Sequence, residues 1–193
     1  NDVCIRSTAL AQLWACASCE QCLGPLRAHL MEKDEQVRLA CLGSILKLEE
    51  DLGALQELCL QSLKDGASSV VLLALTTLDD RCDTLEKEDE CCHGLGPFLC
   101  HGDAQVRQAT CVLLGKMKQE GRGTAERLLE GEGLQPWPEQ NTAVLEARRR
   151  ALSNLRGEVQ NDSHYGVGGE EVEEEATALE RHDGVLPQLG ELQ

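Results

Sequence analysis

One short pattern recurs along the chain and constrains what it can fold into: Asp, two residues, a β-branched residue, then Arg. It occurs at 2–6, 34–38 and 103–107, starting at Asp2, Asp34 and Asp103 and ending at Arg6, Arg38 and Arg107. The first two aspartates are 32 residues apart and the next two 69 apart, about twice 34, which places a missing copy near residue 68. There the sequence keeps a capping residue, Ser68, but has Leu72 in place of Arg. Self-similarity with a period of about 20–50 residues is typical of a repeat array.

Each copy has the features of a helix start. Asp or Ser can accept hydrogen bonds from the free amides of the first turn, and a negative charge suits the positive end of the helix. Small and apolar side chains then follow at helical spacing, as in Val37, Ala40, Ser44 and Leu48. A second apolar stretch precedes each copy, at 23–30, 55–63 and 95–99, and a short polar turn joins the two. The predicted unit is a helix, a tight turn and a helix, repeated every 32 to 35 residues.

The apolar composition favours helices over strands. The chain has 33 Leu but only 2 Ile, and aromatic residues make up 2% of it. Leu is a strong helix former, whereas strands favour β-branched and aromatic side chains. No run of about 18 uninterrupted apolar residues is present, which argues against a membrane-spanning helix. We therefore expect an all-α protein without a membrane partner.

These residues resemble the HEAT-repeat family. The resemblance rests on Leu-x-Pro in the first helix, Asp-x-x-Val-Arg opening the second, and a small Ala two residues after that Arg, best seen at 23–48 and 95–117. It covers residues 2–155, and the armadillo repeats, which are close kin, fit the same pattern. The resemblance implies a right-handed α-α superhelix (a solenoid) of about four helical hairpins. It also implies that the Asp and Arg of successive repeats form a ladder, with Arg6, Arg38 and Arg107 in that role and a break at Leu72.

Charge divides the chain into two parts. Residues 157–193 contain 10 acidic residues and 1 Arg, a net charge of −9, whereas residues 1–156 carry −7. A segment this charged has little apolar surface to offset the entropy cost of ordering. We predict a HEAT-like helical domain at 1–156 and an acidic, disordered tail at 157–193. The acidic balance argues against nucleic-acid binding, because that affinity comes mainly from cations that neutralise phosphate.

Two cysteine clusters are candidates for metal or redox chemistry. Of the 11 cysteines, Cys16, Cys19 and Cys22 are three residues apart, and Cys91, Cys92 and His93 precede Cys100. Thiolates at the first spacing resemble part of an iron–sulfur run, but its fourth Cys is missing. Structural zinc sites present their ligands in pairs two to four residues apart, whereas Cys91 and Cys92 are adjacent and follow what we interpret as an acidic turn, 86–90. We interpret the thiols as reduced core residues of a cytoplasmic or nuclear protein.

No pattern for catalysis is present in the sequence. Some HEAT-repeat enzymes hold iron with His-Glu pairs, and no histidine of this chain is followed by Glu. Phosphate-binding glycine loops and the nucleophile elbow are also absent. We therefore expect a non-catalytic protein–protein interaction scaffold or adaptor, without cofactor or small-molecule substrate, that is a fragment of a longer array. Partners would bind its concave surface, along helices near 34–50, 68–79, 103–118 and 144–155. The alternative is a metal- or thiol-redox-responsive module that uses the two cysteine clusters.

Overall fold

The chain is all-helical in the part that the structure describes, which confirms the all-α prediction. The computed structural model describes residues 2–13, 19–133 and 139–157, and it contains no strand in these ranges. The α-helices are α1 (Val3–Gln12), α2 (Cys19–His29), α3 (Glu35–Leu48), α4 (Leu52–Ser62), α5 (Ser68–Asp80), α6 (Glu88–Leu95), α7 (Ala104–Leu114), α8 (Arg122–Glu130) and α9 (Thr142–Arg156), and two short 3₁₀ helices are η2 (Cys82–Thr84) and η3 (Gly96–Cys100). None of these helices is long and apolar enough to cross a bilayer.

The chain comprises two units, Asn1–Gln160 and Asn161–Gln193. All the described residues belong to the first unit. The predicted acidic tail lies outside the described residues, except for its first residue, Gly157.

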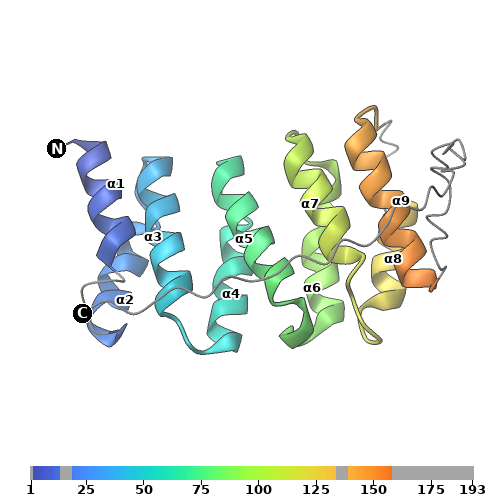
Figure 1. Ribbon diagram of the computed structural model, residues 1–193, viewed down its shortest axis with the longest axis horizontal. Helices are drawn as coiled ribbons and strands as arrows, with labels where there is room; N and C mark the ends of the chain where they lie inside the picture. Colours follow the sequence, from blue (N-terminus) through green and yellow to red (C-terminus); the bar gives the residue numbers. More distant parts are fainter. Residues whose placement is uncertain (1, 14–18, 134–138, 158–193) are drawn as a thin grey trace, which may run out of the picture. The chain divides into compact units, whose positions relative to one another are not determined.

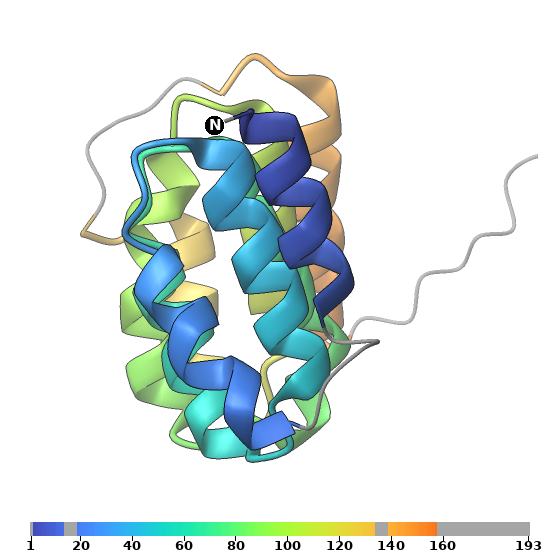
Figure 2. The ribbon, with the colours of Figure 1, turned by 90° about the vertical axis from the view of Figure 1, so that its left-hand side faces the viewer.

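The helices of the first unit form two layers (Figure 1). The odd-helix layer consists of α1, α3, α5, α7 and α9, each of which packs against the next. The even-helix layer consists of α2, α4, α6 and α8; α2 packs on α3, α4 on α5, and α8 on α7 and α9. Figure 2, seen along the row, shows the two layers side by side.

Aspartates begin three helices of the odd-helix layer. The Asp34 carboxylate accepts the amides of Gln36 and Val37 at 2.9 and 3.3 Å. Asp103 accepts the Gln105 amide at 2.8 Å, and Asp2 accepts the Cys4 amide at 3.0 Å. These bonds satisfy donors that the first turn of a helix leaves free, which is why a short polar residue stands there.

The third helical residue of four odd-layer helices lies in the core. Val37, Val70, Val106 and Val144 are all buried, with at most 2% of each residue exposed. Ile5, in the same position of α1, is 68% exposed. Burial of these β-branched side chains between the layers fixes which face of each helix is turned inward.

Two details of the sequence analysis are wrong. The N-cap of α5 is Ala67, which makes no side-chain cap hydrogen bond, and Ser68 is already the first helical residue. The interpretation of 86–90 as an acidic turn also fails, because α6 begins at Glu88. Three acidic residues in a first turn are stabilised by the positive end of the helix, so the same residues fit a helix start.

Candidate functional site

Two arginines of the odd-helix layer each connect three parts of the fold. The Arg38 guanidinium donates to both carboxylate oxygens of Asp65, at 2.7 and 2.8 Å, and its remaining nitrogen donates to the Glu32 and Lys33 carbonyls. The carbonyls belong to the turn before α3, whereas Asp65 lies in the turn before α5. Arg38 therefore holds its own helix, the turn behind it and the next helical pair.

Arg107 repeats this arrangement further along the chain. It donates to both carboxylate oxygens of Glu139, at 2.7 and 3.0 Å, and to the His101 and Gly102 carbonyls at 2.9 and 3.1 Å. The carbonyls are again six and five residues before the arginine. Two-point pairing of a guanidinium with a carboxylate is among the strongest hydrogen-bonded contacts that side chains make.

We call each such link, from an arginine to the acid of the following turn, a rung. A third rung pairs Arg6 with Glu32, but its shortest separation is 3.8 Å and both side chains are more than 30% exposed. The buried Nε of Arg6 has no hydrogen-bond partner among the described residues. This rung is therefore weaker than the rungs at Arg38 and Arg107.

The acids of the rungs share one position relative to the helix that follows. Glu32, Asp65 and Glu139 each stand two residues before the N-cap of the next odd-layer helix, which is Asp34, Ala67 or Asn141. Asp65 also accepts the Ala67 amide, and Glu139 accepts the Asn141 amide. The ladder expected between the arginines and the aspartates of the recurring pattern is wrong in its partners, because those aspartates cap their own helices.

Between α5 and α7, both of which the structure describes, the rung is absent. Counted from the Ala67 cap, the position of Arg38 falls on Val71 and not on Leu72, and Val71 is fully buried. The position of the acid falls on His101, whose Nδ1 accepts the Asp103 amide at 3.0 Å. Both partners of the rung are thus replaced, although His101 keeps the acid's hydrogen bond to the cap residue.

Hydrogen bonding to the arginines shifts the titration of the two strong rungs. The Arg38 hydrogen bonds lower the pKa of Asp65, and those from Arg107 lower the pKa of Glu139, while burial opposes both effects. The pKa values of Arg38 and Arg107 are raised by the same bonds. All four groups are therefore charged at neutral pH, which favours a structural role for them.

The structure describes only part of the first cysteine cluster. Cys16 lies outside the described residues, as does the side chain of Cys19, and Cys22 is buried in the core near α3. Among the described residues, no group of three or more His, Cys, Asp or Glu side chains is placed to hold a metal ion.

The second cysteine cluster is split between the core and the surface. Cys91 and Cys92 are both fully buried, and the Cys92 thiol donates to the Gly121 carbonyl at 3.5 Å. His93 and Cys100 are exposed. The structure therefore does not bring the four side chains to one point.

Burial keeps the core thiols protonated. It raises the pKa of Cys59 and Cys92 to about 12, and that of Cys41, Cys91 and Cys111 to about 11. The thiolate is the form that binds metal and attacks disulfides, so these cysteines are poor candidates for either chemistry.

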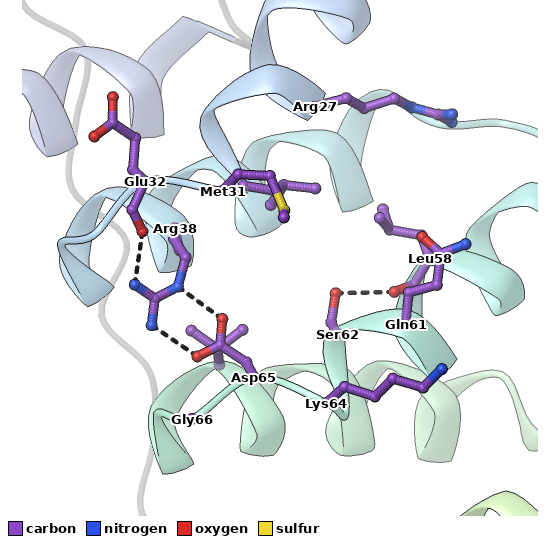
Figure 3. Close-up of a pocket in the computed structure, with 12 residues that line it drawn as sticks. Arg27, Met31, Glu32, Arg38, Leu58, Gln61, Ser62, Lys64, Asp65 and Gly66 are labelled. Atoms are coloured by element: carbon purple, nitrogen blue, oxygen red, sulfur yellow. Dashed lines mark hydrogen bonds and ion pairs between the residues drawn. The ribbon is translucent and has the colours of Figure 1, made fainter.

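Hollows open on the surface of the described residues. A hollow of about 560 Å³, called the turn pocket below, lies between the ends of α2 and α4. Figure 3 shows the Arg38–Asp65 pair on one side of it and Gln61 and Ser62 on the other. Met31, at its rim, is 88% exposed.

Two further hollows lie on the odd-helix layer. One, called the α3–α5 pocket, measures about 810 Å³, and its apolar wall includes Leu39, Ala40, Gly43 and Leu73. The second, called the α7–α9 pocket, measures about 300 Å³ and is lined by Val112, Ala147 and Ala151 with Lys116 and Arg150 beside them. Both pockets run along helices that the sequence analysis assigns to the partner-binding surface.

The acids of the rungs and the pockets were not among the features predicted from the sequence. Only Glu32 stands two residues before a predicted cap, Asp34, whereas the positions of Asp65 and Glu139 follow from caps that the structure alone assigns, Ala67 and Asn141. The pockets leave no signal in the sequence, because they arise from side chains of separate helices.

Comparison with known proteins gives no family for this chain. No protein-family model matches it, and neither a curated protein nor a solved structure has a significant match. The helices, rungs and pockets described above therefore carry the functional argument.

Proposed function

We propose that this chain is a non-catalytic protein–protein interaction scaffold built on HEAT-like repeats. In this proposal the helical hairpins stack as a right-handed superhelix, and partner proteins bind along its concave surface, which is formed by α3, α5, α7 and α9. The observation that carries the proposal is that two pockets lie on these helices, while the most deeply buried charged pairs of the described residues join successive helical pairs.

The repeat interpretation is supported by position-by-position agreement. The N-caps of the four helices are residues 34, 67, 103 and 141, so their spacing is 33, 36 and 38 residues. Each helix buries a valine three residues after its cap. In arrays of this kind each unit contacts only its neighbours, which leaves an extended surface for partners.

A non-catalytic role is supported by where the shifted pKa values occur. Among the described residues they belong to the two strong rungs, to Lys116, Lys118 and Asp83, and to buried thiols. Arg38 and Asp65 line the turn pocket and Lys116 lines the α7–α9 pocket, but each of these groups is paired with an opposite charge of the fold. Here burial and ion pairing within the fold explain each shift.

A cytoplasmic or nuclear location forms part of the proposal. Nine cysteines of the described residues are free thiols, and most of them are buried among apolar side chains. Disulfides form in oxidising compartments, whereas reduced thiols are typical of the cytosol and nucleus. The buried thiols also weigh against the metal- or redox-responsive alternative.

The proposal is tested by mapping a partner to the odd-helix layer. Proteins captured from an extract by the full chain are purified, and their affinity is measured for three variants. Ala40→Arg and Ala143→Arg place a long charged side chain in the α3–α5 and α7–α9 pockets, and Ala28→Arg is the matched control at an exposed position of α2.

We expect at least one pocket variant to weaken binding about ten-fold, a loss of about 1.4 kcal/mol. The control should stay within about two-fold of the unchanged chain. Partners that bind all four proteins equally would contradict the proposed surface. Failure to capture any partner that binds after purification would contradict the scaffold function itself.

A further inference from the structure

The apolar core is divided where α3 meets α5. The core around α3 contains Val37, Leu42 and Ile45, whereas most buried side chains of α5, including Leu75 and Leu78, belong to a second core that continues to α9. Helices α4 and α5, with the turn between them, contribute only Leu58, Ala67 and Val70 to the buried side chains of the first core. The α3–α5 contact is also the least extensive between neighbours in the odd-helix layer.

The turn pocket and the α3–α5 pocket flank this same junction. The turn pocket opens in the even-helix layer, with Leu58 and Val70 in its wall. The α3–α5 pocket opens on the outer face of the odd-helix layer, between Gly43 and Leu73. Protein interiors are close-packed and resist deformation, so a junction with open space on both sides is where two packed blocks can move.

The Arg38–Asp65 rung crosses this junction in the wall of the turn pocket (Figure 3). It joins the start of α3 to the turn before α5 through two hydrogen bonds, and Asp65 is further tied to the Ala67 amide at 2.8 Å. A short two-point contact keeps its ends together while the elements on either side of it rotate, as at a hinge between rigid bodies.

We propose that the helical unit bends at this junction, with the Arg38–Asp65 rung as the pivot. The block from α1 to α3 and the block from α4 to α9 move as rigid bodies, so that the turn pocket narrows when the α3–α5 pocket widens. The two pockets are thereby coupled: filling one changes the shape of the other. This inference stands whether or not a partner protein binds the α3–α5 pocket.

The two methionines of the chain provide the test. Met31 lies at the rim of the turn pocket, and Met117 is buried in the second block, so their methyl groups give one NMR signal for the junction and one internal control. Relaxation dispersion of these methyl signals detects exchange on the microsecond-to-millisecond timescale of hinge motion. In the full chain we expect exchange at Met31 and none at Met117.

Filling the α3–α5 pocket should stop the motion. A Cβ at Gly43 would lie 3.9 Å from the nearest Leu73 carbon, an ordinary contact, so larger side chains at this position enter the pocket. Gly43→Leu should shift the Met31 signal and suppress its exchange, whereas Gly43→Ala, the matched control, should resemble the unchanged chain. Ala40→Leu is a second filling variant, in case Gly43→Leu unfolds.

A rigid junction would give the opposite results. Absence of exchange at Met31 in the full chain would overturn the proposal. So would a Met31 signal that neither filling variant alters while the Met117 signal shows that the fold is intact. Equal changes at Met31 and Met117 would also overturn it, because they would report a motion of the whole unit.

Discussion

The guanidinium of Arg107 and the carboxylate of Glu139, 32 residues apart in the chain, are joined by two hydrogen bonds of 2.7 and 3.0 Å. The Glu139 side chain is only 3% exposed and that of Arg107 11%. This pair ties α7 to the residues that lead into α9. It is the most deeply buried of the three rungs.

Removal of this arginine should be costly. Arg107→Ala leaves a buried carboxylate without its partner, and we expect the free energy of unfolding to fall by about 3 kcal/mol. Arg6→Ala removes a longer and more exposed pair and should cost less than about 1 kcal/mol. Urea denaturation of the full chain measures both. Equal losses for the two variants would show that burial does not set the strength of a rung.

The two strong rungs should make stability depend on acid pH. The folded pKa values of Asp65 and Glu139 lie below their ordinary values of 3.8 and 4.5, so the unfolded chain binds protons more readily. Their contribution is complete above the ordinary pKa values and is lost as the pH falls through the lowered ones. The stability difference between the unchanged chain and an Arg38→Ala, Arg107→Ala double variant should therefore be large at pH 7 and shrink below about pH 4.

Thermal or urea unfolding at pH 7 and at acid pH checks this expectation. A difference that stays constant over the whole range would mean that the rungs do not contribute through ionised carboxylates. Arg6→Ala is the control, since its weaker rung should give a smaller difference at either pH.

Two glycines of the odd-helix layer should respond oppositely to alanine. A Cβ at Gly115, which caps the end of α7, would lie 2.6 Å from the Ala151 Cβ and 2.7 Å from its Cα, so α7 and α9 would have to move apart. We expect Gly115→Ala to destabilise the fold by about 2 kcal/mol, as overpacking does.

Gly43→Ala is the matched case, because its Cβ meets only an ordinary contact and alanine favours the helix. It should be neutral or stabilising by up to about 1 kcal/mol. Urea denaturation compares both variants with the unchanged chain. A Gly115→Ala variant as stable as Gly43→Ala would contradict the close approach of α7 and α9.

The cysteines should differ in reactivity according to burial. Cys4 and Cys100 are exposed, whereas burial raises the pKa of Cys91 to about 11 and that of Cys92 to about 12. With iodoacetamide at about pH 8, we expect the exposed pair to be modified at least about a hundred-fold faster than the buried pair. Mass spectrometry of digested protein gives the rate for each residue.

Urea-unfolded protein is the control, because there all the thiols should react at similar rates. Rapid modification of Cys91 or Cys92 in the folded protein would revive the redox-responsive alternative.

Local interactions explain what the sequence could predict. The cap at Asp34 and the buried helix face at Val37 depend on hydrogen bonds and spacing within a few residues. A short segment of sequence is therefore enough to predict both. The wrong prediction of Ser68 as the cap of its helix also has a local origin. Ala67 has no capping side chain, and the sequence therefore offered the nearest polar residue as the helix start.

The all-helical character of the described residues could be predicted from the amino-acid sequence alone, because Leu-rich spacing and caps act within each helix. Only the tertiary structure decided which acid each arginine meets, that Cys91 and Cys92 are both buried, and that pockets flank the junction of α3 and α5. The partners of a rung are more than 25 residues apart and meet only after two helical pairs have packed. Contacts of that kind depend on how whole elements fit together, which no local pattern specifies.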